Sequence, residues 1–258
     1  MHINERVLGI GLDNGCYSNN VNLTSVDVEN SIRLFGKCRA CVEGLMKAPA
    51  KKKSKSEPAR EIGYRIAMDL IPLSETSLGG NNWGMIGTDE KCGYIFMCGM
   101  KKKNIVYVED GIWNIVIEVW SYVHEVKEIL FDNEQVFNAA AKFVRSKGIV
   151  PLYTPSGLHN NLSERYTQTV KTKKRILLAA LPYVLPKILH LEALLSAARS
   201  CNISPNHKSG DTKTPYFLMK KRRPDIDEYS FGTVGLAYVI RADNRDVRGE
   251  MSLSLIHI

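Results

Sequence analysis

Short runs of β-branched and aromatic residues, separated by polar or Gly-rich segments, open the main part of the sequence. Such runs predict strands that are joined by short connections. They lie at residues 64–70, 83–87 and 94–100. Because consecutive strands with short connections usually pair with one another, we expect an antiparallel meander.

Strand-like and helical segments alternate after this meander. Residues 104–125 have the Val, Ile and Trp content of strands but the length of a helix, and we predict a helix there. The remaining predicted elements are a strand at 127–132, an Ala-rich helix at 133–147, a strand at 149–154, and helices at 163–180 and 185–199. The order βββαβαβαα predicts an α/β fold.

A segment without apolar periodicity divides the chain. Residues 48–60, APAKKKSKSEPAR, are rich in Lys, Ser, Pro and Ala, a composition typical of a linker. We therefore expect a small N-terminal module at residues 1–47 and a larger domain after the linker. Within the module, Cys38 and Cys41 have the CxxC spacing of a zinc knuckle.

Charge is the feature of the composition that bears most on function. The 258 residues include 35 Lys and Arg and 27 Asp and Glu, which gives a formal net charge of +8. A basic protein favours polyanionic partners such as nucleic acid. No unbroken apolar run approaches the roughly 18 residues of a membrane span, so we expect no membrane partner. The six cysteines are few for a disulfide scaffold and no secretory signal is apparent, so we expect a reducing compartment.

Three acidic residues stand where metal-dependent chemistry would need them. Asp69 lies in the first strand-like run, Asp132 at the end of the fourth, and Glu164 in the first turn of a helix. Carboxylates from separate chain positions can converge on divalent ions that assist the cutting or joining of phosphodiesters. The alternative is local, since Asp132 would cap the following helix and Glu164 would favour a helix N-terminus. Other acids, among them Asp89 and Asp110, are predicted to lie in loops.

One face of the helix at 163–180 carries a polar and basic stripe. Steps of one and two turns along this face reach Gln168, Lys171 and Arg175, and Lys174 widens the basic surface. Such a stripe can follow a phosphate backbone with salt-dependent, sequence-independent affinity. A solvated helix face is the alternative interpretation.

Four segments follow one another in a distinctive order: IAMDLIP, LFDNEQVF, YTPSGLHNNLSER and KTPYFLMKKRRPDIDEYSFGTVGLAYV. This order resembles the integrase region of copia-type LTR-retrotransposon polyproteins. The last segment is the most specific, because copia-type integrases follow their catalytic core with a Lys-Thr-Pro-Tyr run, a Lys-Pro-Asp turn and a strand similar to Phe-Gly-Cys-Ala-Tyr-Val. Residues 213–216, 223–225 and 231–239 match these features, and residues 220–223 resemble a contact to the DNA backbone.

The resemblance implies a fold and an activity. The fold would be an RNase H-like core at residues 61–200, whose mixed sheet has three antiparallel and then two parallel strands flanked by helices. Its triad would be Asp69, Asp132 and Glu164, which would hold Mg²⁺ or Mn²⁺. The activity would be processing of the 3′ ends of element DNA and their transfer into target DNA, by a homo-oligomer on double-stranded DNA. The protein would act in the nucleus after a stage in a cytoplasmic particle, and residues 201–250 would form a post-core segment.

The N-terminal module resembles the HHCC zinc domain of the same family, in which two histidines precede a CxxC. His2, Cys38 and Cys41 would be three of four tetrahedral zinc ligands, so residues 1–47 are expected to be a truncated module of this kind. The first histidine would precede Met1. We expect Met1 to lie within a longer reading frame and residues 251–258 to be a non-native tail.

Two alternative functions stay open because the sequence departs from the family beside its second acid. Glu134 and Gln135 stand where family members usually carry glycines. A catalytically decayed remnant that binds nucleic acid, or an RNase H-like nuclease, would account for the same set of acids and bases. An integrase is the leading hypothesis.

Overall fold

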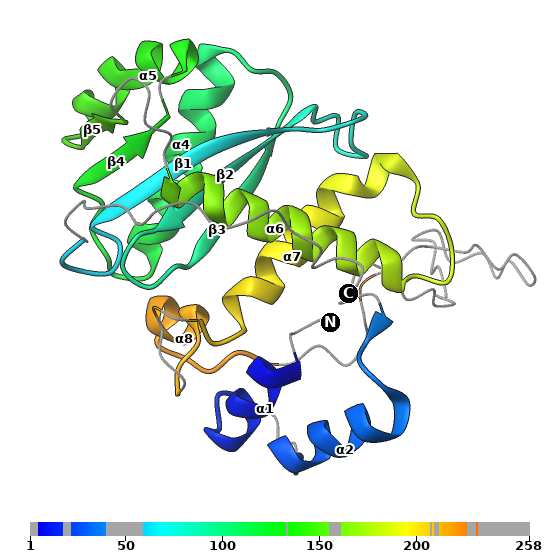
Figure 1. The fold of residues 1–258 in the computed structure, drawn as a ribbon. Coiled ribbons are helices and arrows are strands. Elements are labelled where there is room, and N and C mark those ends of the chain that lie inside the picture. Colours follow the sequence, from blue (N-terminus) through cyan, green and yellow to red (C-terminus); the bar gives the residue numbers. More distant parts are fainter. Residues whose placement is uncertain are drawn as a thin grey trace, which may run out of the picture.

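A five-stranded mixed sheet, in the upper left of Figure 1, forms the core of the larger part of the molecule. The computed structural model describes residues 5–17, 22–39, 59–132, 134–154, 161–206, 208, 212–225 and 231. The strands are β1 (Arg65–Pro72), β2 (Trp83–Asp89), β3 (Ile95–Met100), β4 (Glu128–Phe131) and β5 (Val150–Tyr153). They lie in the order β3-β2-β1-β4-β5, with β1 to β3 antiparallel and β4 and β5 parallel to β1. The predicted α/β fold and mixed sheet are confirmed.

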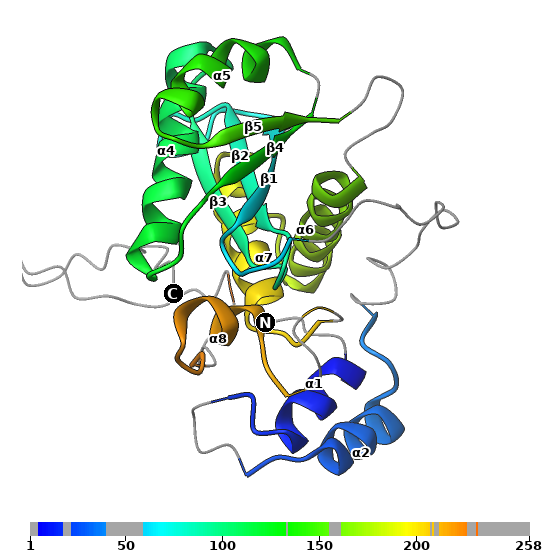
Figure 2. The same ribbon diagram turned by 90° about the vertical axis from the view of Figure 1, so that its left-hand side faces the viewer.

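Helices cover both faces of this sheet (Figure 2). On one face lie α4 (Ile105–Ser121) and α5 (Gln135–Ser146), and on the other lie α6 (Asn161–Ala180) and α7 (His190–Asn202), which follows a 3₁₀ turn at Lys187–Leu189. A separate buried apolar cluster fills each interface between helices and sheet. The three layers place β1 and β2 against α6, which contacts both strands.

The ambiguous segment at 104–125 is helical, as α4. Asn104 caps its N-terminus, where the side chain accepts a hydrogen bond of 3.1 Å from the backbone N–H of Tyr107. Val108, Ile112 and Ile115 are among the side chains that it buries against the sheet, at the three- and four-residue spacing of a helix face. Packing against the sheet therefore outweighs the modest helix propensity of its β-branched residues.

A glycine in β2 sets how closely α4 approaches the sheet. A Cβ added at Gly87 would come within 3.1 Å of Ile115 and 3.2 Å of Ile66. Ile66 in β1 is fully buried, and Ile115 in α4 is nearly so. The small residue thus lets two branched side chains meet across the helix–sheet interface.

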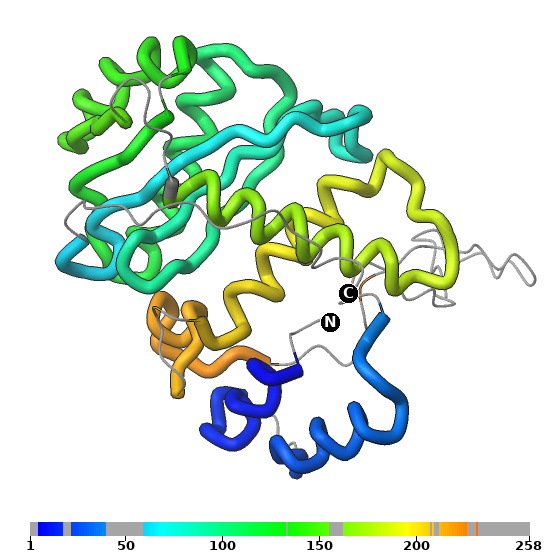
Figure 3. The backbone as a smooth tube through the Cα atoms, viewed as in Figure 1, coloured from blue at the N-terminus to red at the C-terminus, as the bar shows by residue number. Residues whose placement is uncertain are grey.

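Two helices precede the sheet, α1 (Glu5–Asp13) and α2 (Ser25–Phe35). Thr24 and Asp27 form a capping box at the start of α2, and the carboxylate of Asp13 accepts a 2.7 Å hydrogen bond from the backbone N–H of Ser25. The tube in Figure 3 shows this pair beneath α7, apart from the sheet. Most of the predicted linker at 48–60 lies outside the described residues.

A short helix that the sequence pattern did not predict, α8 (Pro215–Lys220), lies in the expected post-core segment. The Thr214 side chain accepts a 3.0 Å hydrogen bond from the N–H of Phe217, and Pro215 occupies the first turn. Of the expected strand at 231–239, only residue 231 is described. No helix among the described residues is long and apolar enough to cross a membrane.

The prediction that Asp89 and Asp110 lie in loops is wrong. Asp110 belongs to α4, and Asp89 is the last residue of β2. The Asp89 side chain is fully buried and accepts hydrogen bonds from the backbone N–H groups of Gly63 at 2.7 Å and Cys92 at 2.6 Å. It pairs backbone donors of two turns, a role that sequence spacing does not reveal.

Candidate active site

Asp69 lies in the middle of β1, on the face of the sheet that α6 covers. Its Oδ2 accepts a hydrogen bond of 2.9 Å from the hydroxyl of Thr167 in α6, and its Oδ1 accepts one of 2.8 Å from the N–H of Leu70. The side chain is half-buried. The bond from Thr167 therefore fixes α6 against the strand that carries the first predicted acid.

Asp132 directly follows β4, the parallel neighbour of β1. The register pairs Met68 with Phe131, so Asp69 and Asp132 are the next positions along two adjacent strands. Adjacent strands lie about 4.8 Å apart. The structure thus brings the first two predicted acids side by side, at equivalent positions of two adjacent parallel strands.

The surroundings of Asp69 disfavour its negative charge. Burial raises the pKa of the Asp69 carboxyl, and the negative charges of Asp132 and Glu134 raise it further. The hydrogen bonds from Thr167 and from the Leu70 N–H lower the pKa in opposition. A partly desolvated carboxylate beside other carboxylates is an environment that a cation would stabilise.

Glu134 is an acidic neighbour of this pair that sequence analysis did not assign to the site. It precedes α5, and its Oε2 lies 2.8 Å from the Nζ of Lys103. The same ammonium lies 5.0 Å from the ring centroid of Trp83, at the start of β2. The position of Glu134 two residues after Asp132 was a usable signal, whereas Lys103 and Trp83 join only through the fold.

Glu164, the third predicted acid, lies in the first turn of α6. It precedes Thr167 by three residues, so both side chains lie on the same side of the helix. Nowhere in the described parts of the chain do three His, Cys, Asp or Glu side chains form a group that could hold a metal ion. The structure therefore brings Asp69 and Asp132 together and leaves Glu164 one helical turn from the contact with Asp69.

The predicted basic stripe lies along α6, beyond the acids. Gln168 and Arg175 are exposed, and Lys171 and Lys174 are partly buried. Burial lowers the pKa of the Lys174 ammonium, and the positive charge of Lys171 lowers it further. The two lysines thus stand close enough to repel each other, and an anion between them would relieve that repulsion.

His190 continues the stripe at the start of α7, and sequence analysis gave it no role. Its Nδ1 lies 3.3 Å from the hydroxyl of Ser74, and Lys187 pairs with Glu75 at 3.0 Å nearby. Burial lowers the pKa of His190, the charges of Lys174 and Lys187 lower it further, and Glu75 opposes them. The basic surface therefore extends from α6 to the loop that follows β1.

The expected zinc ligands fall mostly outside the described residues, where His2 and Cys41 lie. The backbone N–H of Cys38 donates a 2.8 Å hydrogen bond to the Glu5 carboxylate, and its side chain packs against Ile176 of α6. Zinc binding by these residues stays a prediction.

Comparison with known proteins identifies the fold. No family model and no curated protein sequence matches the chain. Among solved structures, a chain of the simian T-cell lymphotropic virus intasome in complex with PP2A regulatory subunit B56 gamma matches 83% of this chain and 75% of its own, with a TM-score of 0.51 and 14% identity. The catalytic core domain of BIV integrase matches 62% of this chain and 95% of its own, with a TM-score of 0.46 and 15% identity. The match to the intasome chain shows an integrase-like fold.

Proposed function

We propose that the chain is the integrase part of a retrotransposon polyprotein, which processes DNA 3′ ends and joins them to target DNA. The observation that carries the proposal is the contact between strand and helix at Asp69. Asp132 stands next to it on the neighbouring parallel strand, and Thr167 ties to it the helix that carries Glu164. The likeness to an intasome chain in fold supports the same proposal.

The donor set suits a hard divalent cation, because it consists of oxygen ligands alone. Asp69 and Asp132 would hold Mg²⁺ or Mn²⁺, with Glu164 as the third carboxylate. When bound, such an ion supplies positive charge to the reacting phosphodiester and lowers the pKa of an attacking hydroxyl or water. Thr167 would keep Asp69 oriented, since its hydroxyl already bonds one carboxylate oxygen. Zinc at His2, Cys38 and Cys41 belongs to the proposal as a structural site.

The DNA backbone would lie along α6. Gln168, Lys171, Lys174 and Arg175 would contact phosphates, which positions a duplex without reading its sequence. A helix that carries both the third acid and the phosphate contacts would place a bound strand at the metal. We further propose a homo-oligomer on DNA, in the nucleus after a cytoplasmic particle stage, because joining two ends requires that both be held together.

A second candidate is a chain that binds nucleic acid without catalysis. The observation that favours it is that the described residues assemble no group of three metal ligands, while Thr167 occupies one oxygen of Asp69. Such a protein would bind duplex DNA with a steep salt dependence and without turnover. A hydrolytic nuclease would use the same acids with water as the only nucleophile.

The products of one reaction separate these functions. The purified full chain would be incubated with a labelled element-end duplex and supercoiled plasmid, with Mg²⁺ or Mn²⁺ or with a chelator. An integrase yields labelled strands joined to plasmid, only when the cation is present. Nicks without joined strands would assign a nuclease, and binding without any product would assign the non-catalytic alternative.

A further inference from the structure

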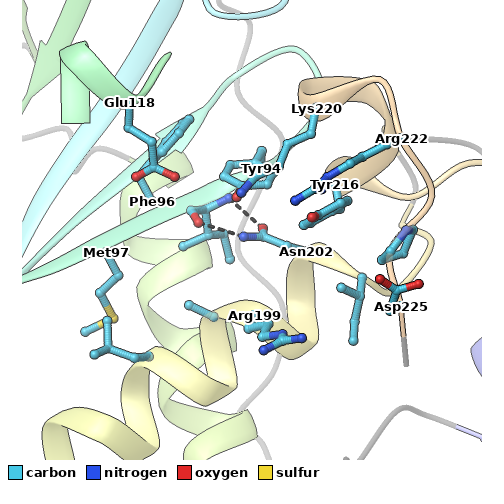
Figure 4. Close-up of a pocket in the computed structure, with 15 residues that line it drawn as sticks. Tyr94, Phe96, Met97, Glu118, Arg199, Asn202, Tyr216, Lys220, Arg222 and Asp225 are labelled. Atoms are coloured by element: carbon cyan, nitrogen blue, oxygen red, sulfur yellow. Dashed lines mark hydrogen bonds between the residues drawn. The ribbon is translucent and has the colours of Figure 1, made fainter. Parts of the chain in front are cut away.

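A pocket of about 450 Å³ opens at the far edge of the sheet from β5 (Figure 4). Its walls come from β3, from α4 at Glu118, from the C-terminal half of α7, and from α8 with the turn after it. The edge strand β3 is two strands away from β1, a lateral separation of about 10 Å. The pocket is therefore a second site, apart from Asp69 and Asp132.

The wall formed by α8 is fixed by Lys220. Its ammonium lies 4.7 Å from the ring centroid of Tyr122, 4.9 Å from that of Tyr216 and 5.7 Å from that of Tyr94. Tyr216 belongs to α8 itself, whereas the contacts of Lys220 with Tyr94 and Tyr122 hold α8 against the edge of the sheet. The sequence resemblance grouped Lys220 with a contact to the DNA backbone, which stays a prediction, and in the fold this side chain also shapes the pocket.

At the floor of the pocket, the edge strand β3 cannot pair with a further strand at Ile95. The N–H of Ile95 donates a 2.7 Å hydrogen bond to Oδ1 of Asn202, whose Nδ2 donates one of 2.8 Å to the carbonyl of Ile95 (Figure 4). The amide of Asn202 thus takes both backbone groups that a strand added at this point of β3 would need. This disfavours an extended peptide as the occupant of the pocket.

The remaining lining combines a flat aromatic surface with cations. The Arg222 guanidinium lies 5.8 Å from the ring centroid of Tyr216, and Arg199 reaches the pocket from α7 on the other side (Figure 4). Tyrosine rings and arginine planes stack on bases, and guanidinium groups bind phosphates in bidentate fashion. Glu118 and Asp225 also line the pocket, and their carboxylates would accept hydrogen bonds from a base or a sugar. This mixed lining suits a nucleotide better than a purely acidic peptide.

We propose that this pocket binds one unpaired nucleotide of a DNA strand, with its base on the Tyr216–Arg222 surface and a phosphate at Arg199. The choice of DNA rests on the proposed function, whereas the stacking geometry does not. A volume of about 450 Å³ lies in the range of small-molecule sites and admits a mononucleotide. The pocket would hold an end or a displaced base that leaves the duplex on α6.

Photocrosslinking tests the proposal with the full chain in the presence of a chelator, so that no metal-dependent reaction contributes. The probe is a single-stranded oligothymidylate that carries one 5-iododeoxyuridine, and the crosslinked peptide is identified by mass spectrometry. We expect a crosslink at Tyr216. Crosslinks that form only outside the pocket would overturn the assignment.

Affinity of the same oligonucleotide, measured by fluorescence anisotropy, adds matched variants. Arg222→Gln and Tyr216→Leu should each weaken binding of the oligonucleotide about tenfold. Tyr216→Phe keeps the aromatic ring for stacking and should bind with the affinity of the wild type. The matched control is Arg145→Gln on α5, which removes the same charge from an exposed site outside the pocket. The proposal would be overturned if Arg222→Gln and Arg145→Gln lost the same affinity for the oligonucleotide. It would also be overturned if polyglutamate displaced the labelled oligonucleotide as well as unlabelled oligonucleotide does.

The two proposals fail separately. If the chain does not join DNA ends but still crosslinks at Tyr216, the nucleotide pocket stands and the proposed function falls. If joining proceeds while Tyr216 never crosslinks and Arg222→Gln binds as the wild type does, the proposed function stands and the pocket assignment falls.

Discussion

Asp69, the first acid of the proposed metal site, lowers the stability of the folded protein when it is ionised. Because burial and two neighbouring carboxylates raise its pKa, the folded protein holds this proton to higher pH than the unfolded chain does. Stability therefore decreases as the pH rises through the ordinary Asp pKa of 3.8 towards the raised folded value, and the ionised carboxylate is unfavourable at neutral pH.

This cost predicts the effect of Asp69→Asn. Without divalent cations the variant should be more stable than the wild type, on the order of 0.5–2 kcal/mol. The amide carries no charge, its oxygen can accept from the Leu70 N–H, and its NH₂ group can donate to the Thr167 hydroxyl. Mg²⁺ should raise the melting temperature of the wild type and leave that of the variant unchanged. Thermal unfolding with and without Mg²⁺ measures both, and equal Mg²⁺ stabilisation of the two proteins would contradict the assignment of Asp69.

Glu164 and Glu134 compete for the role of third acid, and a matched pair of variants decides between them. Glu164→Gln should lower joining of DNA ends more than about a hundredfold, because it would remove the proposed third metal ligand. Glu134→Gln should retain most of the activity, since that carboxylate is already paired with Lys103. Joining rates under saturating Mn²⁺ give the comparison. The reverse order of effects would transfer the role to Glu134.

The sequence allowed prediction of part of this site. Asp69 and Asp132 were predicted to converge from separate strand-like runs, and the parallel register of β1 with β4 brings them together. Thr167 and Lys103 were not, because their contacts arise from how α6 and the segment after β3 pack onto the sheet. Glu134 could have been predicted from its position two residues after Asp132. Its effect on the pKa of Asp69 could not, because that effect depends on the folded chain.

At the scale of elements, most of the sheet was predictable from apolar runs and short connections. The segment at 104–125 was ambiguous because its Val, Ile and Trp content suits a strand while its length suits a helix. Its burial against the sheet decides for the helix. The short helix α8 escaped prediction because its six residues are too few to show a period. A threonine cap and the tyrosines around Lys220 stabilise it instead.

The stripe on α6 predicts a change in the salt dependence of duplex binding. The double variant Lys171→Gln, Arg175→Gln should lower the slope of log affinity against log salt by about 0.9 for each phosphate that it no longer neutralises. Lys142→Gln with Arg145→Gln, both exposed on α5, should leave the slope unchanged. Fluorescence anisotropy across a salt series measures it. An unchanged slope in the α6 variant would mean that the stripe does not follow DNA.

The junction between α6 and α7 should give stability a pH dependence of its own. Because burial and the charges of Lys174 and Lys187 lower the pKa of His190, the folded state binds this proton less readily than the unfolded chain. The contribution is complete above the ordinary pKa of 6.5 and is lost as the pH falls below it. Urea unfolding should show that the free energy of unfolding falls less between about pH 7.5 and about pH 5.5 in His190→Gln than in the wild type. An equal loss in both proteins would rule out His190 as the source.

At the scale of the whole molecule, the layers separate two kinds of surface. The paired acids lie on the side of the sheet that α6 covers, the basic stripe lies along α6 itself, and the edge at β3 carries the pocket. The overall charge of +8 agrees with a polyanionic partner, and the fold extends the predicted stripe on α6 to His190 at the start of α7. The likeness to an intasome chain concerns this arrangement of layers as a whole.

The most direct test of the account is the yield of joined strands from Asp132→Asn compared with that from Asp110→Asn. Asp110 is an exposed acid on α4, so its variant makes the same chemical change away from the site. With Mg²⁺ or Mn²⁺, Asp132→Asn should join DNA ends at less than about a hundredth of the wild-type rate while binding duplex normally, and Asp110→Asn should join at the wild-type rate. Joining by Asp132→Asn at the wild-type rate would contradict the proposal that Asp69 and Asp132 form the metal site.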